Sequence, residues 1–116
     1  MKSALHRISD MVKECQFIID SIGTVSFEEF ADNPLLWHSA AMAIAIIGEA
    51  ARGIPDDFKG QYDHTPWKSI VAMRNILIHE YFNIDLVALY NTCTTDIPKL
   101  YRDLKAICKA EGWECE

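Results

Sequence analysis

Apolar residues recur at three- and four-residue spacing through most of the chain, the period of helices that bury one face. The first such segment follows Ser3 and runs to about Ser21. Serine is a good helix cap, and Gly23 is a natural stop. A first helix is therefore predicted between them. Its apolar face comprises Leu5, Ile8, Val12, Cys15, Ile19 and Ile22.

A second long helix is predicted from Leu35 to about Arg52, after Asn33 and Pro34 at the cap and first helical positions. A short helical turn precedes it, because Ser26 and Glu29 have the spacing of a capping box. This helix is the least polar segment, so we expect a central or dimer-facing position. Its small residues would permit the close approach of another helix: Ala40, Ala41, Ala45, Gly48 and Ala51.

The second half of the chain continues the helical pattern. Residues 53–65 form a long loop, for which a function or a short helical turn is expected. Thr65 and Pro66 then predict the start of a helix, Asp85 predicts the cap of the last one, and Pro98 should break or kink it.

No segment shows strand alternation, so the predicted fold is all-α, an up-and-down bundle of four to five helices. One domain is expected over residues 1–110, with a frayed tail over 111–116.

The composition narrows the possible partners. The chain has 116 residues, enough for one domain, and a formal net charge of −6. That charge argues against a protein that coats nucleic acid non-specifically, but it leaves room for a small basic site. Arg52, Lys68 and Arg74 are the few cations that could line a cleft. Half of the residues are hydrophobic, which suits a homodimer that hides one more face.

The cysteines and the N-terminal residues indicate in which cellular compartment the protein is expected. Cys15, Cys93, Cys108 and Cys115 form no C-x-x-C pair, so we interpret them as free thiols in a reducing cytosol. The N-terminus lacks the apolar core of a secretory signal. The most apolar run, residues 40–48, is far shorter than the roughly 20 residues that cross a bilayer. A cytoplasmic protein is expected.

The candidate chemistry lies in residues 73–82, where Arg74, Asn75, His79 and Tyr81 interrupt an apolar run. Such groups are costly to bury without partners. A neutral imidazole can take the proton from a ribose 2'-hydroxyl, and a guanidinium can stabilise the charge that builds on a phosphate. Arg74 and His79 differ in direction by about 140° on a regular helix, which suggests that the helix ends near His79.

RNA cleavage also needs an acid for the leaving oxygen. In a two-fold dimer, two copies of His79 could face each other and divide the acid and base roles. No cofactor or metal is predicted. Structural alternatives remain open: His79 as a hydrogen-bonded core histidine, Arg74 as an ion-pair partner of Glu49, Asn75 as a helix cap or dimer bridge, and Tyr81 as a core aromatic.

The pattern Arg74-Asn75-x-x-x-His79-x-Tyr81 resembles the R-x4-H-x-Y motif of HEPN domains, specifically of the HepT-like toxin family. The resemblance covers roughly residues 5–104. Its flanks stand in the family's order and rough spacing: Ile46-Ile47-Gly48-Glu49-Ala50-Ala51, Pro66-Trp67, Ile70, Met73 and Phe82.

The resemblance implies a HEPN-like homodimer with a composite site at the dimer cleft. It implies the toxin of a toxin-antitoxin pair, a metal-independent endoribonuclease that leaves a cyclic phosphate. Arg74 and His79 would be catalytic, with Asn75 supporting the site. The partner would be a minimal nucleotidyltransferase antitoxin that AMPylates Tyr81. The alternative is a catalytically silent HEPN dimer that binds a nucleotide or its antitoxin; the acidic charge favours this slightly, and the intact motif favours the enzyme more.

Overall fold

The computed structural model describes residues 3–79 and 84–115, without the side chains of residues 75–79. Within these ranges the chain is helical and contains no strand, which confirms the all-α prediction. The elements are α1 (Ala4–Ile22), α2 (Phe27–Ala31), α3 (Pro34–Arg52), α4 (Asp56–Gln61), α5 (Trp67–His79), α6 (Leu86–Asn91), a π-helical turn (Thr92–Asp96) and α7 (Ile97–Glu111).

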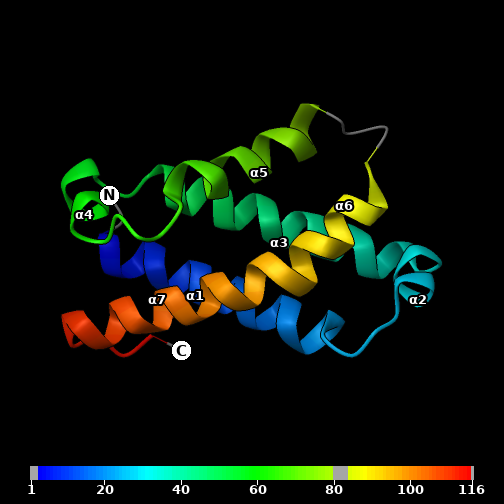
Figure 1. The fold of residues 1–116 in the computed structure, drawn as a ribbon, viewed down its shortest axis with the longest axis horizontal. Coiled ribbons are helices and arrows are strands. Elements are labelled where there is room, and N and C mark those ends of the chain that lie inside the picture. Colours follow the sequence, from blue (N-terminus) through cyan, green and yellow to red (C-terminus); the bar gives the residue numbers. More distant parts are fainter. Residues whose placement is uncertain (1–2, 80–83, 116) are drawn as a thin grey trace.

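The long helices run up and down beside one another (Figure 1). α3 packs against α1 on one side and α5 on the other, and α1 also packs against α7. The predicted central position of the α3 segment is therefore confirmed. α4 lies at one end of the bundle, whereas α2 and α6 lie at the other (Figure 1). α5 makes its extensive packing contacts with α3 and lies towards the outside of the bundle.

Side-chain caps fix where most helices begin. Asp85 Oδ1 accepts a hydrogen bond from the Ala88 amide at 3.1 Å, and three other predicted caps also form. These are Ser3 with His6, Ser26 with Glu29, and Asn33 with Leu36. Thr65 is the exception. α5 begins at Trp67, and Thr65 Oγ1 is buried with no hydrogen-bond partner among the described residues, so the prediction that Thr65 caps α5 is wrong.

The last segment bends without breaking. The π-helical turn at residues 92–96 joins α6 to α7, and Pro98 follows it in the first turn of α7. Proline lacks an N–H and crowds the preceding turn, and a widened turn can accommodate it. The predicted disturbance near Pro98 is thus present as a π turn within a continuous segment.

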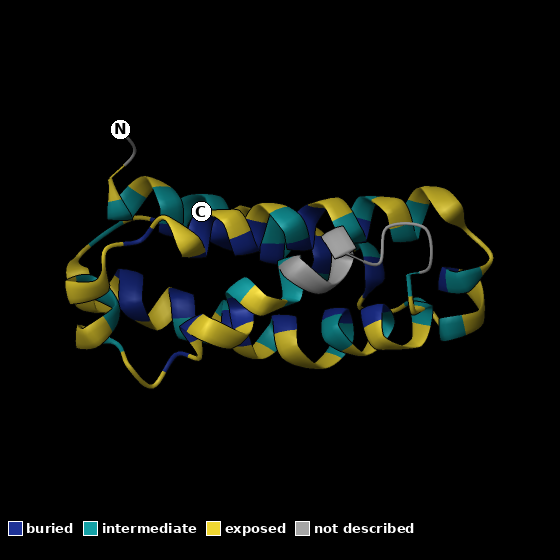
Figure 2. Ribbon diagram, turned by 90° about the horizontal axis from the view of Figure 1, so that it is seen from above, coloured by how far each residue is buried: buried dark blue, intermediate teal, exposed yellow. Residues whose placement is uncertain are grey.

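Buried apolar residues line the space between the long helices, and exposed positions alternate with them along the described parts of these helices (Figure 2). Phe30, Ile47 and Leu104 are among the fully buried side chains. By length and mean hydropathy α3 would also suffice to cross a membrane. The core helix of a bundle passes the same test, and α3 is packed between α1 and α5.

Cys108 and Cys115 form a disulfide, so the interpretation of all four cysteines as free thiols is wrong for this pair. The bond closes the chain back onto α7 just after Gly112, whose φ of 74° suits glycine. The Trp113 ring stacks on Phe58 of α4 at 5.7 Å between centroids. Trp113 and Cys115 therefore contact the helices within the segment for which a frayed tail was predicted.

Candidate active site

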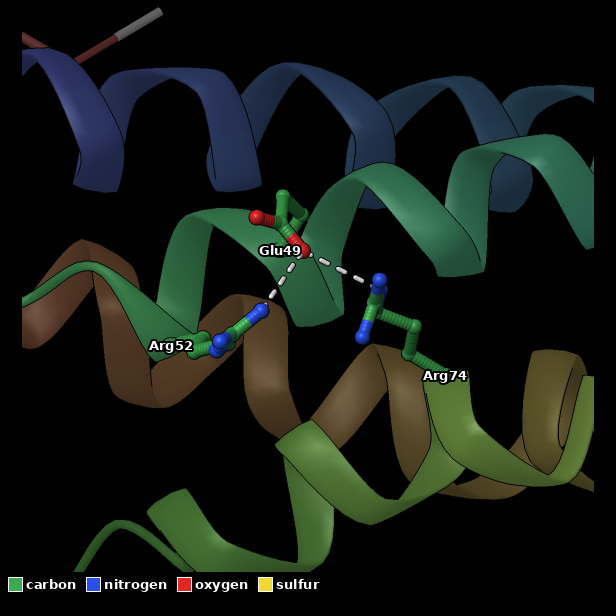
Figure 3. A network of polar contacts seen from close by, with 3 residues as sticks. All are labelled: Glu49, Arg52 and Arg74. Carbon is green, nitrogen blue, oxygen red and sulfur yellow. Dashed lines mark ion pairs between the residues drawn. The ribbon is translucent and has the colours of Figure 1, made fainter. Parts of the chain in front are cut away.

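Arg74 projects from α5 towards α3, where it forms an ion pair with Glu49. Arg74 Nε lies 3.1 Å from Glu49 Oε2. Figure 3 shows Glu49 between Arg74 and Arg52, whose Nη1 is 4.0 Å from the same oxygen. The pairing of Arg74 with Glu49, one of the open alternatives from the sequence, is thus observed.

The ion pair leaves the arginine available for further chemistry. A guanidinium carries five N–H donors, and Glu49 engages the one on Nε. The Glu49 side chain is more than half exposed, so solvent screens the pair and its contribution to stability is small, about 0–1 kcal/mol. Its main effect is to orient the guanidinium. A structural and a catalytic role for Arg74 are therefore compatible.

Gly48 lets the two helices approach closely at this point. A Cβ on Gly48 would lie 2.5 Å from Arg74 Cβ and 3.4 Å from the Ile70 carbonyl oxygen. Any side chain here would push α5 away from α3, since the atom in the way belongs to the base of Arg74 and cannot swing aside. Gly48, one of the small residues expected to allow close helix approach, thus acts at the candidate site.

For the remaining motif residues, the structure describes the backbone at most. Asn75 and His79 belong to α5 and are four residues apart, which places their backbone positions on one face. Their side chains lie outside the described residues. Tyr81 also lies outside the described residues, as does the segment just after His79 where the helix was predicted to end. Of the predicted site residues, the structure therefore gives a side-chain position for Arg74.

A cavity of about 670 Å³ opens beside the first turns of α5. Three cations line it, Arg52 from the end of α3, Lys59 from α4 and Lys68 from α5, together with the carboxylates of Asp56 and Asp63. Arg52 and Lys68 were predicted from the sequence as cleft cations, whereas Lys59 and Thr65 were not predicted at this site. Both residues belong to the long 53–65 loop, for which a function was expected. That expectation was the sequence feature that could have identified them.

The two free cysteines supply no reactive thiol. Cys15 and Cys93 are buried, and desolvation raises the pKa of each to about 12. The thiolate is the nucleophilic form and is scarce at neutral pH when the pKa is this high. These residues are part of the core.

A family model for HepT-like ribonucleases matches residues 1–107, nearly the whole chain. The chain belongs to the HepT-like ribonuclease family. Membership indicates an enzyme of the ribonuclease class. The family named from the motif is therefore confirmed, and the long match is consistent with a HEPN-like helical bundle.

Individual relatives agree with this family. A candidate RNase from Caldanaerobacter subterraneus is 34% identical over 111 residues, 96% of this chain and 99% of the relative. A candidate RNase from Methanocaldococcus jannaschii is 34% identical over 98 residues, 84% of this chain and 90% of the relative. A probable ribonuclease HepT from Thermococcus cleftensis is 34% identical over 93 residues, 80% of this chain and 84% of the relative. No solved structure matches the chain significantly.

Proposed function

We propose that this HepT-like ribonuclease is a metal-independent endoribonuclease and the toxin of a toxin-antitoxin pair, acting in the cytoplasm. The observation that carries the proposal is the placement of Arg74. Its guanidinium is held by Glu49 on the outer side of the α3–α5 contact, five residues before His79 on the same helix. So exposed an ion pair adds little stability, and the remaining N–H donors of Arg74 are free for the proposed chemistry.

The proposed reaction uses the ribose of the RNA as the nucleophile. The His79 imidazole takes the proton from the 2'-hydroxyl, and the 2'-oxygen attacks the neighbouring phosphorus. The 5'-oxygen leaves and takes a proton from the second copy of His79. The products are a 2',3'-cyclic phosphate and a 5'-hydroxyl. Arg74 stabilises the negative charge on the phosphate oxygens in the transition state, and Asn75 supports the site.

The second His79 would come from a homodimer. Leu35, Met42 and Ile46 are exposed apolar residues of α3, separated by seven and four residues, so they form one stripe along the helix. Leu35 is 78% exposed and Met42 is 64% exposed. A stripe of this kind on the central helix suits contact with a second copy. Glu49 continues the stripe three residues later, which would bring Arg74 close to the dimer axis.

Control of the enzyme is proposed to act through Tyr81. A minimal nucleotidyltransferase antitoxin would transfer AMP to its hydroxyl and place a bulky anion beside Arg74 and His79. RNA phosphate would then be excluded by volume and by charge. A gain in mass of one or more AMP units on the peptide that holds Tyr81, only in cells that carry the neighbouring gene, tests this step.

A silent HEPN dimer that binds a nucleotide or the antitoxin is the second candidate. The net charge of −6 favours it, because an acidic protein repels free RNA. The two candidates differ in cells. A toxin slows growth when it is expressed, and His79→Ala relieves the effect. Equal growth with both proteins would favour the silent module.

The test in vitro is cleavage of single-stranded RNA in excess EDTA. We expect RNA fragments with 2',3'-cyclic phosphate ends, and no cleavage of the same strand with 2'-deoxyribose. Products with a 5'-phosphate, or cleavage of the deoxy strand, would rule out attack by the 2'-hydroxyl.

A further inference from the structure

The cavity beside α5 has the features of an anion site. α5 begins there, and the first amides of a helix carry partial positive charge and point outward. Arg52, Lys59 and Lys68 add three cationic side chains to the same wall.

Thr65 points independently to a ligand. It lines the cavity and is 1% exposed, yet its Oγ1 has no hydrogen-bond partner among the described residues. A buried hydroxyl without a partner destabilises a fold. Valine has nearly the same shape and would avoid this cost. A phosphate bound in the cavity would be the hydrogen-bond partner that this hydroxyl lacks.

The cavity is linked to the candidate active site. Arg52 lines the cavity and also approaches Glu49, whose carboxylate holds Arg74 (Figure 3). Along α5, Lys68 and Ala72 line the cavity. The backbone positions of Asn75 and His79 follow on the same stripe, since they come seven and eleven residues after Lys68. At 1.5 Å per residue, Lys68 and His79 are separated by about 16 Å, a span of a few nucleotides.

We propose that this cavity binds a backbone phosphate of the RNA substrate, a few nucleotides from the bond that is cleaved. This inference rests on the proposed ribonuclease function. The lining carries three cations and two carboxylates, a net charge of +1, which suits the single charge of a phosphodiester better than a dianionic phosphate. Such a site would let a protein with a net charge of −6 bind RNA through one local cluster of cations.

Two variants test the site. Lys68→Gln removes one cation, and Thr65→Val removes the hydroxyl while keeping its shape. Lys13→Gln is the matched charge control, because Lys13 is an exposed residue of α1 outside the cavity. All three are made in the full chain, both in the native background and with His79→Ala to prevent cleavage during binding measurements. Fluorescence anisotropy with a labelled random-sequence RNA of about 20 nucleotides reports affinity.

We expect Lys68→Gln to raise the Kd for RNA about three- to tenfold and to lower the salt dependence by about 0.7, the slope of one phosphate contact on a single strand. Thr65→Val should raise the Tm and still weaken RNA binding. In the native background kcat should hold while KM rises. Lys13→Gln should match the parent protein.

Failure of this inference differs from failure of the proposed function. If the parent protein cleaves RNA and both cavity variants behave like Lys13→Gln, the phosphate site is refuted and the ribonuclease stands. If the variants weaken binding of AMP but leave RNA affinity unchanged, the site serves a nucleotide and the inference is overturned. If the parent protein neither binds nor cleaves RNA, both proposals fall.

Discussion

A methyl group on Gly48 would lie 2.5 Å from the Cβ of Arg74, well inside van der Waals contact. The closeness of α3 and α5 therefore depends on a glycine at this position. The next residue, Glu49, can then reach Arg74 Nε at 3.1 Å. Helix packing and the orientation of the candidate catalytic arginine are thus set by two adjacent residues.

Gly48→Ala should impair both stability and activity. The clash with the base of Arg74 costs about 1–3 kcal/mol, and better helix propensity returns about 1 kcal/mol of it. We expect the free energy of unfolding to fall by up to about 2 kcal/mol in urea denaturation. The rate of RNA cleavage should fall at least tenfold, because Arg74 moves away from Glu49.

Gly60→Ala is the matched control for stability. A Cβ on Gly60 meets nothing within 4 Å. Its free energy of unfolding should stay the same or rise by up to about 1 kcal/mol, since alanine favours the helix. If Gly48→Ala is as stable and active as the native protein, the close approach does not position Arg74.

Glu49→Gln should separate orientation from stability. The carboxylate is half exposed, so removing its charge should change the free energy of unfolding by less than about 1 kcal/mol. We expect kcat to fall about tenfold with little change in KM, because Glu49 positions Arg74 without touching RNA. Glu49→Asp should recover part of the rate. An unchanged kcat in Glu49→Gln would show that Arg74 needs no such support.

Local signals in the sequence were strong enough to predict most of the fold. The caps at Ser3, Ser26, Asn33 and Asp85 formed as expected, because each satisfies amides that its own helix leaves free. The apolar period identified the long helices and the central place of α3. Thr65 failed as a cap, since tertiary packing buried its hydroxyl without a partner.

The candidate site was only partly predictable. Residue spacing predicted Arg74 as a site residue, and its pairing with Glu49 was one open alternative that the structure shows. The sequence could not show that Gly48 sets the distance between the helices. The cavity was missed because Lys59 and Thr65 come together with Lys68 only after the 53–65 loop folds against α5. The Cys108–Cys115 disulfide was missed because sequence spacing says nothing about the sharp return at Gly112.

Met42→Glu should disrupt the proposed dimer. Met42 is exposed on α3, so the charge should not disturb the monomer's core, but it would be buried in the interface. Sedimentation should show a monomer, and RNA cleavage should be lost. Val87→Glu changes another exposed apolar residue, on α6 and outside the stripe, and should remain dimeric. A dimeric, active Met42→Glu protein would exclude this face of α3 as the interface.

The cysteines should differ sharply in reactivity. Cys15 and Cys93, with pKa values raised to about 12 by burial, should resist iodoacetamide at pH 8 in the folded protein. Cys108 and Cys115 should react only after reduction, which should lower the free energy of unfolding by about 2 kcal/mol. Mass spectrometry counts the labels. Rapid labelling of Cys108 before reduction would contradict the disulfide.

The most direct test of the central claim compares RNA cleavage by the native protein with that by Arg74→Ala and His79→Ala. All three should show the same helical circular dichroism and similar thermal unfolding, which is the control that separates loss of activity from loss of fold. The native protein should cleave RNA in EDTA and leave cyclic phosphate ends, and both variants should lose activity by at least a hundredfold. Native-like cleavage by folded His79→Ala or Arg74→Ala would show that the reaction does not depend on that residue.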